Sequence, residues 1–325
     1  MNKKVVVFIF LSFFSGIVAK AQEEIVDFLN AGIEDANALG QEYLRPYGEM
    51  LGVSLNGAWY NSAKVHKVLG FDVMFSASYV TVPAGGKTFD VSELTLKKVA
   101  AKDGNTAPTM AADRSVEQTF YFKDDPFHTD ILNIKGSELN YFVSPMLQAA
   151  VGLPFHTEVM GRFMPKVDIF NYGKISMWGL GVKHSVKDYI PFIKRIPFLE
   201  FSILGAYTNF SSNLGVEYNG NEGELDMNAS AYNARALVGI NVAVLSVYTG
   251  LGYGNTSSSF DVKGTFTGIP FETGPVENPI SIGYTTDGFD FNVGLRLRLA
   301  IFAIYADYTV GDYSVITAGV GFNFR

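Results

Sequence analysis

From Met50 onward, apolar and polar side chains alternate with a period of two along most of the chain. Successive side chains of a β-strand face opposite sides, so this period predicts strands with one apolar face. The clearest case is Phe289–Leu299, where Phe, Val and Leu alternate with Asp, Asn, Gly and Arg. The segments with this pattern are Leu69–Tyr79, Leu139–Val151, Thr157–Val167, Lys174–Val186, Leu199–Tyr207, Ala229–Val242, Ser246–Thr256, Phe289–Leu299, Ala303–Val310 and Val315–Arg325.

The connections between these segments alternate between short and long. The short ones are Gly152–Phe155, Pro191–Pro197, Asn241–Leu245 and Ala300–Phe302, and the long, polar ones are Pro83–Glu138, Asn209–Asn228 and Asn255–Gly283. Short turns at one end and long loops at the other are typical of outer-membrane β-barrels.

Further strands are possible at Leu51–Tyr60, Phe89–Leu96 and Gln118–Lys123. We therefore predict an all-β fold, a transmembrane antiparallel β-barrel of about 10–14 strands. A soluble β-sandwich is the alternative, but it does not ordinarily combine such loop asymmetry with strands this long.

The segment Glu24–Tyr43 has a different period, because its apolar residues recur at threes and fours, which predicts one short amphipathic helix. We expect Pro46 and Gly48 to end it. This helix would plug the lumen, cap the periplasmic mouth or lie on a membrane surface. The expected organisation is a signal peptide at residues 1–21, the N-terminal helix at 22–47 and the barrel at 48–325.

The first residues have the three parts of a cleavable signal peptide: basic Met1–Lys4, apolar Val5–Val18, and Ala19–Ala21 with small residues at both ends. An uncleaved anchor is the alternative, but the apolar run is short for a membrane span. Together with the strands, this leader predicts the outer membrane of a Gram-negative bacterium.

The amino-acid composition excludes several kinds of functional site. The 325 residues include no cysteine, which excludes disulfides, thiolate metal sites and a lipid-modified cysteine. The net charge of -7 gives no support to nucleic-acid binding. The four histidines form no metal-binding spacing, and no GxSxG element accompanies His184 and Ser185. We therefore expect no cofactor, no metal and no enzyme; a lipid-modifying enzyme would have to depend on His184 or Ser185.

Several charged side chains fall on the face that the alternation turns toward the barrel interior. They would either line a channel that selects a solute or form ion pairs that fill a small barrel, since buried charge must be hydrated or paired. These lumen-lining candidates are Asp72, Glu158, Arg162, Lys183, Glu200, Arg235, Arg296, Arg298 and Asp307. Inward apolar residues would supply an apolar path or pack a closed interior; they are Met74, Met160, Met164, Leu204 and Leu237.

Glycines at spacing two form another pattern on the same face, in the pair Gly179 and Gly181, the run Gly250–Gly254, and the pair Gly319 and Gly321. They would leave room for a plug helix, a ligand or sharp strand curvature. Aromatic residues near predicted strand ends fit the interfacial girdles of membrane barrels. Those are Trp59, Tyr60, Tyr79, Trp178, Tyr207, Tyr253 and Tyr308.

A resemblance supports this interpretation. Leu55–Lys64, Leu69–Asp72, Gly152–Phe155, Trp178–His184 and Tyr189–Pro191 resemble a family of uncharacterised Gram-negative outer-membrane proteins along almost the whole chain after the leader. That family's function is unassigned, so the resemblance supports a barrel fold more than any particular activity. More distantly, a helical plug before a mid-sized barrel is similar to the long-chain fatty-acid transporter group. This chain is shorter than typical members and lacks their N-terminal Asn-Pro-Ala signature.

From these features we expect an outer-membrane channel or plugged transporter for a small, possibly hydrophobic, solute. The alternative is a non-transporting barrel whose long extracellular loops bind a partner or surface ligand. The expected partners are outer-membrane lipid, the barrel-assembly machinery during insertion and an unidentified small solute.

Overall fold

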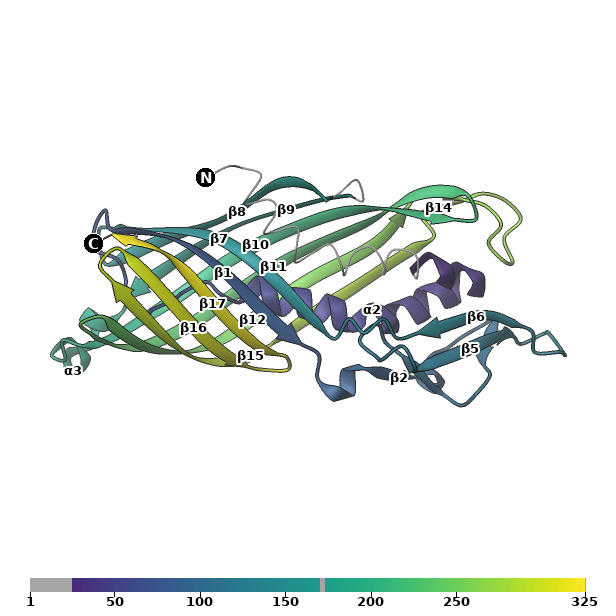
Figure 1. Ribbon diagram of the computed structural model, residues 1–325, viewed down its shortest axis with the longest axis horizontal. Coiled ribbons are helices and arrows are strands. Elements are labelled where there is room, and N and C mark those ends of the chain that lie inside the picture. The colour runs from purple at the N-terminus through teal and green to yellow at the C-terminus, as the bar shows by residue number, and fades with distance from the viewer. Residues whose placement is uncertain (1–24, 170–172, 325) are drawn as a thin grey trace.

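Ten antiparallel strands close into a barrel in the computed structural model, which describes residues 25–169 and 173–324 (Figure 1). Their order around the wall is β1-β17-β16-β15-β12-β11-β10-β9-β8-β7, and β1 also pairs with β7, which completes the closure. The strands are β1 (Phe71–Thr81), β7 (Tyr141–Leu153), β8 (Thr157–Ile169), β9 (Gly173–Ser185), β10 (Leu199–Tyr218), β11 (Asn221–Val242), β12 (Leu245–Lys263), β15 (Ile280–Leu299), β16 (Phe302–Val310) and β17 (Ser314–Phe324). The predicted all-β barrel is thereby confirmed, at the lower end of the expected strand range.

One end of the barrel carries short connections and the C-terminal end of β17, and we call it the turn end. It also holds two short helices, η4 (Lys187–Tyr189) and α3 (Pro191–Lys194), between β9 and β10. The opposite, loop end carries residues 82–140 and the β12–β15 connection, in which β13 (Thr265–Phe266) pairs with β14 (Val276–Glu277).

The outer face of the barrel is apolar in a band that starts at the turn end. Phe71 stacks on Phe324 there, with ring centroids 4.7 Å apart. Toward the loop end the band finishes in aromatic contacts between neighbouring strands, such as Tyr207 with Trp178 at 5.3 Å and with Tyr232 at 4.7 Å. An exposed apolar band bounded by aromatic residues is what a lipid-facing wall requires. Outward residues in this band include Val73, Leu180, Ile203, Val238, Leu251, Phe291, Val293, Leu295, Ile304, Ile316 and Val320.

The wall is much taller on one side than on the other. Strands β10, β11, β12 and β15 have 19 to 22 residues, whereas β16 has 9 and β1 and β17 have 11 each. About 9–11 residues suffice for a strand to cross a membrane, so the tall side extends beyond the lipid. Residues 280–290 of β15 pair with β12 but lie beyond the end of β16, which leaves a sheet edge.

The N-terminal segment passes through the barrel. After η1 (Phe28–Ala31) and Gly32, helix α2 (Ile33–Asn56) starts at the loop end and lies against β15 and β12. The chain then continues without regular structure through residues 57–70 and reaches the turn end, where β1 begins. We call residues 33–70 the plug. The plug covers the β15 edge, since Asn37 Nδ2 donates to Pro279 O at 2.9 Å and Ser281 N donates to Asn37 Oδ1 at 2.9 Å.

Residues 82–140, the outer module, form two small sheets at the loop end (Figure 1). One pairs β2 (Thr88–Asp90) with β4 (Thr106–Pro108), and the other joins β3 (Val99–Ala101), β5 (Glu117–Phe122) and β6 (Asp130–Lys135). Two single-turn helices, η2 (Ala84–Gly86) and η3 (Val91–Glu93), flank β2. The module is fastened to the plug, because the buried Asp35 carboxylate accepts hydrogen bonds from the backbone N–H groups of Lys97, Lys98 and Val99.

Several sequence expectations are corrected by this arrangement. The helix continues past Pro46 and Gly48 to Asn56, because burial of its later turns in the lumen offsets the missing proline N–H. Leu51–Tyr60 is therefore helix and plug, and the wall begins at Phe71, not at residue 48. Much of Asn209–Asn228 and Asn255–Gly283 is strand, and Phe89–Leu96 and Gln118–Lys123 contribute to the outer module and not to the wall. The predicted signal peptide, residues 1–21, lies outside the described residues.

Replacing Asp35 should loosen the outer module without opening the barrel. In Asp35→Asn the new NH2 group faces backbone donors, and the loss of charge-assisted hydrogen bonds should cost roughly 2 kcal/mol, about a thirtyfold shift in local opening. Limited proteolysis followed by mass spectrometry should show faster cleavage within residues 82–140. Glu34→Gln is the matched control, because it removes only an exposed pair with Lys97 on the same helical turn. Equal cleavage rates in the two variants would contradict this anchoring role.

Candidate functional site

The central feature of the lumen is the end of α2, where backbone carbonyls lose their helical partners inside the barrel. Donors from the wall replace them. Arg162 Nη1 donates to Leu55 O at 3.3 Å and Arg162 Nη2 to Gly57 O at 2.5 Å, while Thr208 Oγ1 donates to Leu55 O at 3.1 Å. Arg162 is 2% exposed, and its Nε donates to Gln148 Oε1 at 3.0 Å, so this buried guanidinium is satisfied by neutral oxygens.

The same kind of contact continues along the plug toward the turn end. Side chains from separate strands of the wall donate to successive plug carbonyls, which fixes the path of a segment with no regular structure. These contacts are Asn233 Nδ2 to Asn56 O at 2.8 Å, Gln148 Nε2 to Trp59 O at 3.1 Å, Lys183 Nζ to Ser62 O at 3.3 Å and Ser202 Oγ to Ala63 O at 2.9 Å.

Trp59 and Tyr60 are the largest side chains of this segment, and both lie in the lumen and not in a lipid-facing girdle. Trp59 is fully buried, with the Arg162 guanidinium 3.7 Å from its ring centroid. Tyr60 donates to Asn292 Oδ1 at 2.6 Å. Inward apolar residues pack around them in one cluster, so they form a closed interior and not an apolar path. Those residues are Met74, Met160, Leu204 and Leu237; Met164 belongs to the larger core near the loop end.

An ion-paired cluster lies nearer the turn end. Lys183 Nζ is 2.9 Å from Glu158 Oε1, and both side chains are buried. Glu158 Oε2 also accepts from the backbone N of His66 at 2.9 Å and lies 2.6 Å from His66 Nδ1. His66 Nε2 is 3.6 Å from Asp72 Oδ2. His66 could not be predicted from sequence as part of this cluster, because its neighbours match neither a strand nor a helix pattern.

A second cluster of charged side chains lies nearer the loop end. Arg235 makes a two-pronged contact with Asp290, at 2.5 Å and 2.7 Å. Asp307 accepts from Tyr248 at 3.0 Å.

By strand alternation all nine lumen-lining candidates lie on the inward face. Three of them stand apart from the buried pairs: Glu200 lies 4.0 Å from Lys187, Arg298 Nη1 donates to Asn323 Oδ1 at 3.4 Å, and Arg296 has no ion pair among the described residues.

The paired glycines leave room for the plug. A Cβ atom at Gly181 would come within 2.9 Å of Trp59, and one at Gly179 within 3.1 Å of the same ring. A Cβ at Gly250 would overlap the Tyr60 hydroxyl, and one at Gly254 would lie 2.7 Å from Asn56. Gly319 and Gly321 instead make room for the wall residues Tyr305 and Met74.

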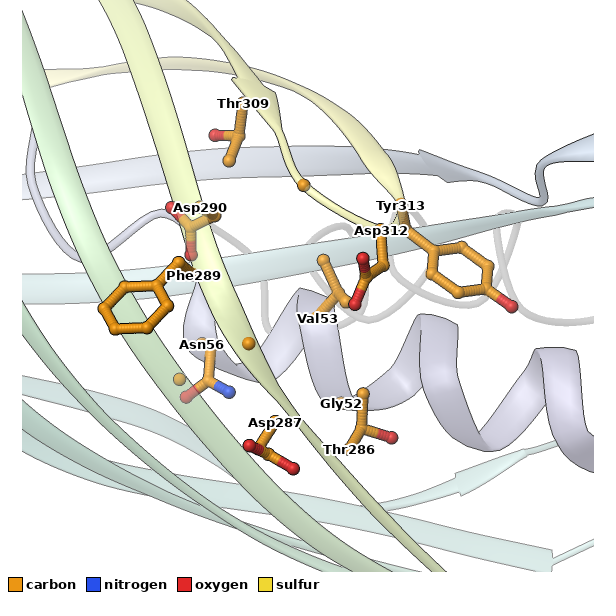
Figure 2. Close-up of a pocket in the computed structure, with 13 residues that line it drawn as sticks. Gly52, Val53, Asn56, Thr286, Asp287, Phe289, Asp290, Thr309, Asp312 and Tyr313 are labelled. Carbon is orange, nitrogen blue, oxygen red and sulfur yellow. The ribbon is translucent and has the colours of Figure 1, made fainter.

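A pocket of about 480 Å³, part of it open to solvent, lies at the loop end, between the last turns of α2, the β15 edge and the β16–β17 turn. Figure 2 shows Asp287, Asp290 and Asp312 around Asn56 of the helix. Of these carboxylates, Asp290 is paired with Arg235, and Asp287 accepts from Tyr253 at 2.7 Å. The lining therefore contains three carboxylates set in a surface that is mostly apolar.

His184 and Ser185 make separate contacts. His184 contacts the hydroxyls of Thr157 and Tyr189, at 2.9 Å and 3.0 Å, whereas Ser185 faces the Phe201 carbonyl. Within residues 25–169 and 173–324, no three His, Cys, Asp or Glu side chains are grouped to hold a metal ion. Over the same residues, no helix has the length and apolar character of a membrane span.

The fold and the filled lumen define a transmembrane β-barrel with an internal plug. The chain belongs to the family of unknown function DUF6588, whose sequence profile matches residues 1–324. The resemblance to an uncharacterised barrel family is thereby confirmed. No curated protein matches the chain in sequence.

Solved barrels are similar to it only distantly. The attachment invasion locus protein Ail of Yersinia pestis is 11% identical, with 79% of this chain and 99% of that chain covered and a TM-score of 0.26. The translocator domain of the autotransporter NalP from Neisseria meningitidis is 12% identical, with 80% and 90% covered and a TM-score of 0.35. The outer membrane protease OmpT from Escherichia coli is 8% identical, with 81% and 100% covered and a TM-score of 0.37. At these values no activity is transferred, and the barrel assignment rests on this chain's own strand pairing.

Filling the space opposite Trp59 should destabilise the plugged barrel. Gly181→Val adds atoms against a fully buried ring, and overpacking of this kind costs roughly 1–3 kcal/mol. Gly205→Val is the matched control, because a Cβ there meets no atom within 4 Å and the side chain points outward. Urea unfolding in lipid vesicles should give a lower midpoint for Gly181→Val than for Gly205→Val. Equal midpoints would show that the lumen-facing glycines do not hold the plug.

Proposed function

We propose that the protein is an outer-membrane transporter in which the plug closes the lumen and a small solute passes when the plug shifts. The turn end faces the periplasm and the loop end faces outward, as the usual asymmetry of such barrels implies. The contacts between the wall and the plug support this proposal most directly. From Leu55 to Ala63, besides the packing around Trp59 and Tyr60, the wall holds the plug by hydrogen bonds to backbone carbonyls, which water can replace when the plug moves.

Two further features support a plug that moves. Trp59 Nε1 and the side-chain oxygen of Asn56 are buried and have no hydrogen-bond partner among the described residues. Such groups are costly to keep, so hydration in a shifted state would lower the free energy of opening. The pocket at the loop end borders α2 directly, so a solute that enters it would contact the plug.

Locking the plug to the wall tests this proposal. A Cβ at Gly52 would lie 3.1 Å from Thr256 Cβ, close to disulfide geometry, and the chain has no cysteine of its own. Gly52→Cys combined with Thr256→Cys should abolish ion conductance in planar bilayers when oxidised and recover it on reduction. Ser78→Cys with Thr317→Cys is the control, because these hydroxyls are 3.1 Å apart across the β1–β17 seam and a bond there leaves the plug free.

A deletion variant makes the result decisive. Removing residues 25–62 takes out the helix and Trp59, and should give permanent, larger conductance steps because the vacated space is about 10 Å wide, the diameter of a helix. A deletion ending at Tyr47 would leave Trp59 and Tyr60 in the lumen. If the folded deletion variant is silent, or if the oxidised Gly52–Thr256 variant conducts like the reduced one, transport through the lumen is wrong.

A binding role for the outer module is the second candidate. Its two sheets are tied to α2 through Asp35 and through Tyr43, whose carbonyl accepts from Met110 N at 3.1 Å. Replacing residues 88–135 with a short glycine-serine linker separates the roles. Lost adhesion to a surface ligand with unchanged conductance would favour binding, and changed conductance would favour a module that controls the plug.

A further inference from the structure

A second pocket opens at the turn end, between the plug and the wall. Plug residues Ser62–Lys67 form one side, and the β11–β12 turn and the end of β15 form the other. It encloses about 740 Å³, part of it open to solvent. This pocket is separate from the acidic pocket at the loop end and shares no lining residue with it.

Arg296 is the unusual residue of this pocket. It is only 8% exposed, yet neither Nε nor Nη2 has a hydrogen-bond partner among the described residues, and no carboxylate oxygen there lies within 4.0 Å. The buried arginines elsewhere in the lumen are engaged: Arg162 by carbonyls of the plug and Arg235 by Asp290. An unpaired buried guanidinium is costly, so this one is the group in the lumen that most lacks a partner.

The other residues that line the pocket also include cationic side chains and a hydrogen-bond donor without a partner. Lys64, Lys67 and Arg298 add positive charge, no acidic side chain lines the pocket, and Asn241 Nδ2 is a further buried donor without a partner. The nearby acids are engaged with other groups. Glu158 binds Lys183 and His66, and Asp72 Oδ2 faces His66 and Asn61, although its Oδ1 is unpaired.

We propose that this pocket binds a phosphoryl group, with Arg296 as its central ligand and Arg298 and Lys64 beside it. One buried and three exposed positive charges suit a multiply charged anion better than a single carboxylate, and a guanidinium fork matches phosphate oxygens in two-pronged geometry. The group is either free phosphate, including a small phosphorylated solute, or a phospholipid headgroup at the inner membrane boundary. The proposal concerns binding alone and holds whether or not the barrel transports.

Isothermal titration of the full mature chain in a maltoside detergent, with inorganic phosphate at constant ionic strength, tests the site. Arg296→Met should weaken binding roughly ten- to a hundredfold. Arg114→Gln is the charge-matched control, because that arginine is exposed in the outer module beside Glu138. Without phosphate, Arg296→Met should be at least as heat-stable as the wild type, since no protein partner is lost, and phosphate should raise the melting temperature of the wild type only.

Native mass spectrometry with added phosphatidylglycerol distinguishes the two sources. Arg296-dependent binding of inorganic phosphate assigns a soluble anion, and Arg296-dependent retention of phosphatidylglycerol without phosphate binding assigns the headgroup. If Arg296→Met does not fold, Arg298→Gln and Lys64→Gln should each still weaken binding severalfold. The proposal is overturned if neither probe binds the wild type better than these variants, or if Arg114→Gln weakens binding as much.

Discussion

A chain that leaves its helix inside a barrel must find partners for its carbonyl groups, and the rest of this lumen is arranged around that requirement. Arg162 and Thr208, on different strands, converge on the end of α2. Because the donors come from separate parts of the wall, the plug and the barrel fix each other's geometry. The plug is therefore part of the fold, and the lumen is closed by specific contacts and not by general filling.

The same plug links the two ends of the molecule. At the loop end α2 covers the β15 edge through Asn37 and holds the outer module through Asp35. At the turn end His66 joins it to the Glu158 ion pair and so to the wall. A change at either end therefore acts on one continuous segment, which gives a physical route between the outer module and the turn end. The two pockets also differ in charge, because three carboxylates line the one at the loop end and cationic side chains line the one at the turn end.

The sequence was informative wherever lipid dictates one face of a strand. Each of the ten alternating segments contains or overlaps a wall strand, because a lipid-facing side chain must be apolar and its neighbour is free to be polar. Beyond the lipid that constraint ends, so the outer halves of β10, β11, β12 and β15 have polar residues on their outward face and their sequence predicts loops. The prediction that the helix ends at Pro46 is wrong for a different reason. Helix propensities describe a solvated helix and not one packed in a lumen.

The site was predictable only in part, for a related reason. Alternation gives the side of the wall on which Arg162 or Glu158 lies, but not its partner, because most partners belong to an irregular segment far away in sequence. His66, Trp59 and Tyr60 carry no periodic signal, so the only indications of a filled lumen are the amphipathic helix and the spacing of the glycines that face Trp59 and Tyr60. The unpaired state of Arg296 depends on every neighbouring side chain at once, which no local pattern encodes.

The position of the plug also constrains the order of assembly. Its two ends are held at opposite mouths, by Asn37 at the loop end and His66 at the turn end, and β1 follows it directly in the chain. The seam between β1 and β17 joins the first and last strands of the wall, the most distant pairing in the sequence. A barrel that closed this seam first would have to draw a helix through a finished pore. The wall must therefore form around the plug, and seam closure is the step that commits the chain to its native topology.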